Sequence, residues 1–462
     1  MEKHNFYQKT VPKFLFILDI LLIILSYNIV YKLRFGEFHG EYLLTYDFSL
    51  IIFFEILVIY IFNAYKVYEF DLNLNLPNRF FLSQIIFIIF FFLILFIFFR
   101  YETGIFGRII FFFGISAYSL IGYLIRILIY KLALRKEKKI PILYLAGNFG
   151  TEKFYEELIN NNTNLRIKYL FPFGKKYQPK IAIKKSDYIL SQSKEINNII
   201  KKEWSAIILG SKLNLEKDTL ELLMEKRLKG IKVFKLHDFF ELIWHKIPIF
   251  SLKEGWFIFS KGFYLIHNLI ELRFKYFFDK IIAFIFLLLS IPLCIITALL
   301  IKIESKGKVF YKQIRSGLNE KKFTLYKFRS MYENAEKDGI KWAKKNDSRI
   351  TKVGKLLRKA RIDEIPQLIN VLKGDMSFVG PRPERPELNK ILKEKIHFYD
   401  IRNVVKPGIT GWAQIMYPYG SSIEDAEKKL EYDLYYIKNY SIFLDLEIIL
   451  KTVRTVLFGK GL

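Results

Sequence analysis

The chain has 462 residues, of which 52% are hydrophobic, and carries a formal net charge of +27. This length suits about three domains, and the charge could reflect nucleic acid, anionic lipid or phosphorylated substrates. Nucleic acid is disfavoured because the basic residues flank apolar stretches and no zinc-finger spacing, aromatic RNA-binding signature or helix-turn-helix pattern is present. The single cysteine, Cys294, excludes a disulfide framework and a cysteine metal cluster.

Four apolar runs fill the first third of the chain, at residues 14–31, 48–65, 80–99 and 109–130. Each approaches the ~20 residues that a membrane-spanning helix needs. Basic residues precede the first run and follow the fourth, which predicts that both ends are cytoplasmic. No small-residue cleavage site follows the first run, so it is not predicted to be a signal peptide. We therefore predict a multi-pass, four-helix transmembrane region over residues 1–135.

Charged residues inside these runs have two interpretations. Asp19 and Glu55 could mark a transport path. Single acids are weak evidence for transport, so a bundle that only anchors the protein in the membrane is favoured. Arg126 lies near the end of the fourth run, where its side chain is expected to snorkel to the membrane surface.

Residues 136–250 alternate between strand and helix patterns. Strands are expected at 141–146, 206–209 and 231–234, and helices at 151–158 and 216–229. This alternation predicts a Rossmann-like α/β domain with a parallel sheet. Gly147 and Gly150 make up less than a dinucleotide fingerprint, so nucleotide binding and a structural or regulatory role both stay open.

A fifth apolar run, residues 281–301, is long enough to span a membrane but lacks the features of an ordinary span. A fifth crossing would place the basic region that follows it outside the cell, and both flanks are basic, so the charge rule gives no direction. Pro292 would kink the helix, and the hydroxyl of Ser290 can satisfy a freed backbone group. We predict a re-entrant helix over about residues 278–302.

The stretch from Arg361 to Pro383 carries the densest chemical signal. Asp363 and Glu364 precede Pro366, which is tolerated in the first turn of a helix, and Lys373 and Gly374 end that helix. In Gly380-Pro-Arg-Pro383 two prolines fix the backbone around Arg382, whose guanidinium could bind phosphate oxygens. The pattern indicates phosphate chemistry, whereas in isolation the two acids could simply suit the helix dipole.

Further basic or glycine-bearing loops surround this stretch at residues 327–331 and 406–414. Two strands, 309–313 and 322–328, predict a hairpin. Amphipathic helices are expected at 430–437 and 444–457, and they could either lie on a membrane surface or pack onto a core.

Four segments, residues 327–331, 361–383, 406–414 and 436–445, resemble the bacterial polyprenyl-phosphate sugar-1-phosphate transferases. The motif match covers about residues 273–462, and the first 270 residues are similar to the large members of that family in architecture only. The resemblance implies a mixed α/β, monotopic catalytic domain at 270–462, on the cytoplasmic face of the bacterial inner membrane. It has modest departures: Ile365 replaces the usual leucine, and one residue separates Ser290 from Pro292.

What the resemblance implies is transfer of a sugar-1-phosphate from a UDP-sugar to undecaprenyl phosphate, releasing UMP, at the start of exopolysaccharide, capsule or O-antigen synthesis. Asp363 falls on the nucleophile, which forms a covalent aspartyl phosphosugar, and Glu364 on its dyad partner. Mg²⁺ is implied as cofactor, with Asp363 as its candidate ligand. The candidate substrate-binding residues are Lys327, Arg329, Arg361, Arg382, Lys406, Thr410, Gly411 and Gln414.

Other interpretations stay open. A non-catalytic scaffold or sensor would not need the Asp363–Glu364 pair, and an ordinary glycosyltransferase would release UDP instead of UMP. The sequence does not indicate which sugar or which polysaccharide is involved. Four-helix anchors of this kind could support a homodimer.

Overall fold

The computed structural model describes residues 2–36, 108–137, 141–146, 150–161, 165–171, 188–190, 193–211, 213, 215–263, 269–332, 349–417, 420 and 422–457. Its contacts divide the chain into two compact units, residues 1–236 and 237–462. Two of the predicted membrane helices, 48–65 and 80–99, and Glu55 lie outside the described residues. The predicted domain boundaries at 135, 250 and 270 stay predictions.

The first unit begins with two long helices, α1 (Glu2–Phe35) and α4 (Arg108–Glu137), which pack against each other. Asp19 of α1 and Arg126 of α4 form a fully buried ion pair, with 2.6 Å between Oδ2 and Nη2 and 3.0 Å between Oδ1 and Nη1. The expectation that Arg126 snorkels was wrong, because the carboxylate of Asp19 neutralises it inside the helix pair. This contact gives Asp19 a structural role that needs no transport path.

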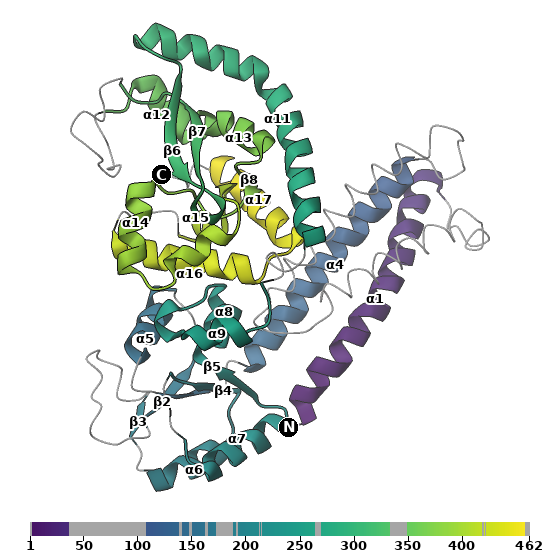
Figure 1. Ribbon diagram of the computed structural model, residues 1–462. Helices are drawn as coiled ribbons and strands as arrows, with labels where there is room; N and C mark the ends of the chain where they lie inside the picture. The colour runs from purple at the N-terminus through teal and green to yellow at the C-terminus, as the bar shows by residue number, and fades with distance from the viewer. Residues whose placement is uncertain are drawn as a thin grey trace. The chain divides into compact units, whose positions relative to one another are not determined.

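A parallel sheet follows, with strand order β3-β2-β1-β4-β5. The strands are β1 (Ile142–Leu145), β2 (Ile167–Phe171), β3 (Tyr188–Leu190), β4 (Ala206–Leu209) and β5 (Lys232–Lys235). The helices are α5 (Thr151–Asn160), α6 (Ser193–Lys201) and α7 (Lys217–Leu228), with α6 and α7 on the opposite side of the sheet from α5 (Figure 1).

Alternating side chains of the sheet are buried on both of its faces. Leu143 and Leu145 belong to one core with Ile200 of α6 and Leu223 of α7, whereas Tyr144 contacts Phe154 of α5. Burial on both faces is typical of parallel sheets. An α/β domain with a parallel sheet is therefore present, while its Rossmann-like character and nucleotide binding stay predictions.

The second unit contains the long helix α11 (Leu269–Glu304), which has Pro292 inside it and bends along its length (Figure 1). We attribute the bend to Pro292, since prolines are the usual cause of sharp helix kinks. Pro292 has no N–H, so the carbonyl of Leu288, four residues earlier, loses its helical hydrogen bond. Ser290 Oγ donates to the neighbouring carbonyl, that of Leu287, at 2.9 Å.

Two of the described helices have stretches long and apolar enough to cross a membrane, Phe14–Phe35 and Ile270–Glu304, and a shorter apolar helical stretch covers Ser116–Ile129. The stretch in α11 leaves most of its apolar side chains exposed within the unit, as lipid contact would require.

The rest of the second unit packs around an antiparallel hairpin, β6 (Phe310–Ser316) with β7 (Lys322–Phe328), and a short parallel pair, β8 (Ser377–Val379) with β9 (Gly408–Thr410). Its helices are α8 (Leu236–Trp244), α9 (Glu254–Phe259), α12 (Lys352–Lys359), α13 (Leu368–Lys373), α14 (Pro386–Lys395), α15 (Trp412–Met416), α16 (Ile423–Lys438) and α17 (Ile442–Leu457). Short 3-10 turns are η3 (Ile249–Ser251), η4 (Leu318–Glu320), η5 (Ile362–Gln367) and η6 (Tyr399–Val404).

The last two helices contribute to the core of this unit. Leu430 and Leu434 of α16 and Ile448 of α17 are fully buried. The sequence left open whether these helices lie on a membrane surface or pack onto a core. Their buried faces pack onto the core.

Candidate active site

Asp363 and Glu364 lie in η5, a tight 3-10 turn that leads into α13. Arg361, just before the turn, has a left-handed backbone with φ of 56°, and Gly374 ends α13 with φ of 86°. The predicted short helix with a glycine stop is therefore present, but the two acids precede its α-helical part. Pro366 contributes no N–H to an α-helical ladder, which favours a separate tight turn at this point.

Three cations surround the carboxylate of Glu364, which is almost fully buried. Lys327 Nζ of β7 lies 2.8 Å from Oε1, Arg361 Nη1 lies 3.4 Å from Oε2, and Arg382 Nη2 lies 3.6 Å from Oε1. Three of the residues predicted from separate sequence segments thus meet at one acid. Glu364 offsets part of their charge and fixes their positions.

Asp363 is different, although it is equally buried. Within the part of the chain that the structure describes, its carboxylate accepts no hydrogen bond and forms no ion pair. Its oxygens are therefore available to a substrate or a metal ion. One acid of the pair organises the cations while the other stays uncommitted.

Electrostatics separates the two carboxyl groups further. Burial by itself would raise the pKa of Glu364, but the charges of Lys327, Arg382 and Arg361 hold that pKa well below its usual range. For Asp363, burial raises the pKa, and the neighbouring charge of Glu364 adds to this against the lowering effect of Lys327. Burial also lowers the pKa of Lys327, and Glu364 opposes that shift.

Asn370 of α13 holds the dyad turn against the hairpin. It is fully buried, its Nδ2 donates to the carbonyl of Thr324 at 2.7 Å, and its Oδ1 accepts from the backbone N–H of Tyr326 at 3.1 Å. Tyr326 directly precedes Lys327, so these bonds set the position of the lysine relative to Glu364.

The loop that carries Arg382 is fixed by backbone contacts with the segment at 406–411. Gly380 N–H donates to the carbonyl of Thr410 at 3.0 Å, and Gly408 N–H to that of Pro381 at 2.9 Å. A Cβ at Gly408 would lie 2.1 Å from the nitrogen of Gly380, and one at Gly411 would lie 2.2 Å from the oxygen of Gly380. Glycine is required here because the two loops approach backbone to backbone.

A buried ion pair between Arg402 and Asp433 contacts the backbone of the same loop. Arg402 Nη2 donates to the carbonyl of Arg382 at 2.9 Å and lies 3.0 Å from Asp433 Oδ2 of α16. Burial raises the pKa of Asp433 to about 6, against the lowering effect of Arg402. This pair links the position of Arg382 to the core.

The other predicted binding residues make contacts away from the dyad. Both terminal nitrogens of Arg329 donate to backbone carbonyls after α11, at Lys306 (3.0 Å) and Ser305 (2.7 Å). These bonds stabilise the end of α11, and the substrate-binding role expected for Arg329 stays a prediction.

The segment 406–414 likewise serves its own packing in this structure. Lys406 Nζ lies 3.9 Å from the ring centre of Tyr276, Thr410 Oγ1 lies 2.7 Å from Thr452 Oγ1, and Gln414 Nε2 donates to the carbonyl of Ile409 at 3.3 Å. Their substrate-binding roles, with that of Gly411, stay predictions. Trp412 is buried in a hydrophobic core.

A metal ion would find few protein ligands at this site. Among the described residues, no group of three or more His, Cys, Asp or Glu side chains could hold one. Mg²⁺, however, is commonly bound through one or two carboxylates together with substrate phosphates, and the uncommitted carboxylate of Asp363 fits that mode. The Mg²⁺ prediction is thus compatible with the residues present and stays a prediction.

Sequence reasoning missed Asn370, Arg402 and Asp433. Asn370 did give a signal, since it interrupts the apolar series Ile369, Val371 and Leu372 of α13, and a polar residue in such a series needs a buried partner. Arg402 and Asp433 gave none, because charged residues are common throughout this basic chain.

Comparison with known proteins places the chain in a family. The family model described as bacterial sugar transferase matches residues 270–459. The UDP-N-acetylgalactosamine-undecaprenyl-phosphate N-acetylgalactosaminephosphotransferase of Aeromonas hydrophila is 49% identical over 183 residues, 40% of this chain and 43% of that protein. The UDP-glucose:undecaprenyl-phosphate glucose-1-phosphate transferase of Klebsiella pneumoniae is 45% identical over 196 residues, 42% of each chain.

The exopolysaccharide production protein PSS of Rhizobium leguminosarum is 40% identical over 198 residues, which are 41% of this chain and 99% of that protein. The chain therefore belongs to the bacterial sugar transferase family, which confirms the resemblance to polyprenyl-phosphate sugar-1-phosphate transferases. The matches span less than half the length of the first two relatives.

Proposed function

We propose that this protein transfers a sugar-1-phosphate from a UDP-sugar to undecaprenyl phosphate and releases UMP, as an early membrane step in exopolysaccharide, capsule or O-antigen synthesis. The observation that carries the proposal is the asymmetry of the dyad. Asp363 is uncommitted within the described residues, whereas three cations surround Glu364. The names of the relatives point to the same substrates.

The proposed reaction has two transfers. An Asp363 oxygen attacks the phosphorus that bears the sugar, the bond from that phosphorus to the bridging oxygen of the diphosphate breaks, and UMP leaves. An oxygen of undecaprenyl phosphate then attacks the aspartyl phosphosugar, which frees the carboxylate of Asp363 and forms a lipid diphosphosugar. A covalent carboxylate intermediate divides one difficult transfer into two easier ones.

The cations around Glu364 supply the electrostatic part of this chemistry. Phosphoryl transfer depends largely on positioning and on neutralising charge, and Arg361 and Arg382 keep partly exposed guanidinium groups that can donate to phosphate oxygens. Bound Mg²⁺ would neutralise part of the donor diphosphate charge. Glu364 holds the arginines in place before substrate arrives.

The test is nucleotide release by detergent-solubilised protein with Mg²⁺, undecaprenyl phosphate and separate UDP-sugars, including UDP-glucose and UDP-N-acetylgalactosamine because the relatives' names differ in the sugar. We expect UMP from one donor for the wild type and none for Asp363→Ala. Release of UDP would identify an ordinary glycosyltransferase, and wild-type function of Asp363→Ala in cells would favour a scaffold.

We also propose that α11 is re-entrant, with the catalytic unit on the cytoplasmic face. Both ends of the helix are attached to the same unit: Lys275 Nζ lies 2.5 Å from Asp445 Oδ2 near its start, and Glu304 Oε1 accepts from the N–H of Val353 at 3.0 Å at its end. Attachment of both ends to one unit supports placing both of them on the same face of a bilayer.

Cysteine labelling tests this placement. In a Cys294→Ala background, Arg273→Cys and Lys306→Cys place single thiols at exposed positions near each end of the apolar stretch. We expect a membrane-impermeant maleimide to label neither in intact spheroplasts and both after permeabilisation. Labelling of one site only in intact spheroplasts would show that α11 crosses the membrane.

A further inference from the structure

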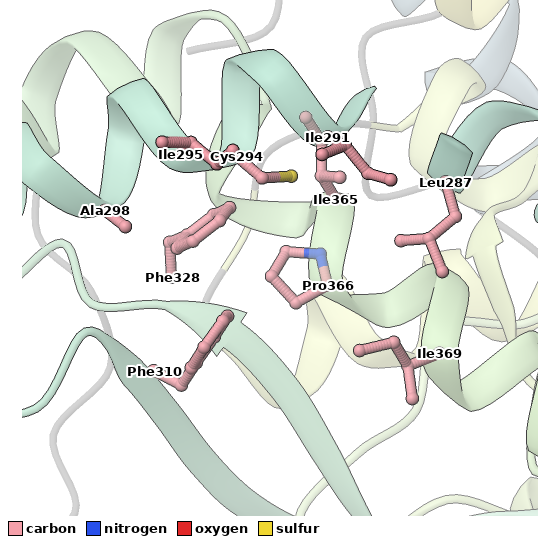
Figure 2. A pocket seen from close by; sticks show the side chains of 10 residues that line it. All are labelled: Leu287, Ile291, Cys294, Ile295, Ala298, Phe310, Phe328, Ile365, Pro366 and Ile369. Atoms are coloured by element: carbon pink, nitrogen blue, oxygen red, sulfur yellow. The ribbon is translucent and has the colours of Figure 1, made fainter. Parts of the chain in front are cut away.

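An apolar cavity of about 290 Å³ lies against the bent helix α11. Figure 2 shows α11 side chains on one side of it, with Pro366 and Ile369 on the other and Phe310 and Phe328 of the hairpin below. Ten residues line it: Leu287, Ile291, Cys294, Ile295, Ala298, Phe310, Phe328, Ile365, Pro366 and Ile369. None of them carries a charge or a hydrogen-bonding amide or carboxyl group in its side chain.

The cavity and the dyad share one turn of backbone. Ile365 and Pro366, which line the cavity, follow Asp363 and Glu364 directly in η5. Consecutive Cα atoms are about 3.8 Å apart, so the boundary between the cationic site and the apolar cavity falls between Glu364 and Ile365. A ligand with a phosphate joined to an apolar chain matches this boundary.

We propose that this cavity binds the isoprene units nearest the phosphate of the polyprenyl phosphate acceptor, so that its phosphate reaches the dyad. The inference rests on the proposed function and adds the site at which the acceptor chain is held. Charge supports the choice of occupant, because Lys327, Arg361 and Arg382 meet at Glu364, which directly precedes the lining residue Ile365.

Access from the membrane supports it too. Five of the lining residues come from the stretch of α11 that is apolar enough to lie in a membrane, from Leu287 to Ala298. A chain dissolved in the bilayer can therefore enter the cavity without crossing water, while its phosphate stays at the cations. Burial of its CH₂ and CH₃ groups there is favourable.

The chain's single cysteine gives a direct measurement. Cys294 lines the cavity, so an occupant should shield its thiol from a small, membrane-permeant maleimide. The detergent-solubilised full chain is labelled alone, with undecaprenyl phosphate, or with dioleoyl phosphatidic acid, which presents a similar headgroup on acyl chains. The control variant is Cys294→Ala/Ile296→Cys, since Ile296 lies two residues away, is exposed and does not line the cavity.

We expect undecaprenyl phosphate to slow labelling of Cys294 at least fivefold, with no effect on the control variant and little effect of phosphatidic acid. Equal protection by both lipids would overturn the proposal in favour of a general acyl-chain site. No protection by either lipid would also overturn it, as would equal slowing in the control variant, which would indicate micelle effects.

Kinetics separates failure of this inference from failure of the proposed function. Ala298→Phe fills the cavity away from the dyad. We expect its KM for undecaprenyl phosphate to rise at least about tenfold, as loss of about two buried CH₂ groups would give. We expect the UMP burst with UDP-sugar alone to keep its wild-type amplitude, because that transfer does not use the acceptor.

A burst in both proteins with an unchanged KM would overturn the cavity assignment only. No burst in the wild type would overturn the proposed function, while labelling of Cys294 would still report whether the lipid binds. Ala298→Leu is the smaller substitution if Ala298→Phe does not fold, and its KM should change in the same direction.

Discussion

At the residue scale, the adjacent acids Asp363 and Glu364 have opposite surroundings. Glu364 forms ion pairs with three cations, and its removal would leave them close together with one carboxylate fewer. Asp363 has no such contacts among the described residues, and the cost of burying its charge outweighs the attraction of Lys327, so its pKa is raised. Stability and reactivity are therefore assigned to different members of the pair.

Neutral substitutions should separate these roles. We expect Glu364→Gln to lower the free energy of unfolding by about 2 kcal/mol, because Lys327, which is mostly buried, loses the carboxylate that it pairs with. Asp363→Asn should leave the melting temperature equal to or above that of the wild type while abolishing UMP release. Thermal unfolding in detergent measures both, and a larger loss of stability for Asp363→Asn than for Glu364→Gln would contradict this assignment.

The pH dependence of activity should follow Asp363. The pKa of Glu364 is lowered, so its stabilising contribution is present above its ordinary value of about 4.3 and is lost only as the pH falls towards its folded value. The pKa of Asp363 is raised by burial, so its nucleophilic form is lost at a higher pH. We expect kcat/KM to fall as the pH decreases, with the midpoint of this acid limb above about pH 4.

Arg358 offers a test of that limb, since its charge lowers the pKa of Asp363. Arg358→Gln should shift the limb to higher pH, measured between about pH 4 and pH 8. Ser330→Ala is the matched control, because it removes the hydrogen bond that Arg358 Nε donates to Ser330 Oγ and keeps the charge. A shift to lower pH in Arg358→Gln would show that another group controls the limb.

At the element scale, the sequence predicted what local pattern determines. Residues 322–328 were predicted as a strand and form β7, the strand at 206–209 forms β4, and Pro292 lies inside a bent α11. β2, β3 and α6 were not predicted, because β2 has five residues and β3 only three, although polar residues from Asn160 to Asn164 and the segment from Pro172 to Gly174 mark turns on both sides of β2. Periodicity is weak evidence over so few residues.

The site was predictable as a set of loops but not as a set of contacts. Lys327, Arg361 and Arg382 were selected because rigid or basic segments surrounded the acids, and they do meet at Glu364. Arg329 belonged to the same motif as Lys327 but contacts the end of α11. Adjacent residues of a motif can serve different partners, and only the tertiary arrangement determines which.

The glycines of the two loops make an element-scale prediction. Gly408→Ala should lower the free energy of unfolding by about 3 kcal/mol, since its Cβ would collide with the backbone of Gly380, and should weaken UMP release by displacing Arg382. The control is Gly255→Ala in α9, where no atom lies within 4 Å of the added Cβ and stability should be equal or slightly higher. Chemical denaturation compares them, and equal losses would refute the backbone-contact argument.

At the scale of the whole molecule, the catalytic unit begins before the region that the family model matches. The compact unit starts at residue 237 and the family match at residue 270. Residues between these points contribute buried contacts: Lys246 Nζ lies 3.1 Å from Glu431 Oε2, and the carbonyl of His245 accepts from Trp412 Nε1 at 2.8 Å. Glu431 and Trp412 are both buried, so each depends on that preceding segment.

We therefore expect a fragment of residues 237–462 to fold in detergent and release UMP. A fragment of residues 270–462 should melt at a lower temperature, because it lacks Lys246 and so loses that buried ion pair with Glu431. Glu431→Gln supplies the control, since it removes the ion pair with Lys246 from the longer fragment and should lower its melting temperature, whereas the shorter fragment has already lost Lys246 and should change less. Equal melting temperatures for the two fragments would show that residues 237–269 do not belong to the catalytic unit. The larger effect expected in the longer fragment distinguishes loss of this ion pair from a general effect of shortening the chain.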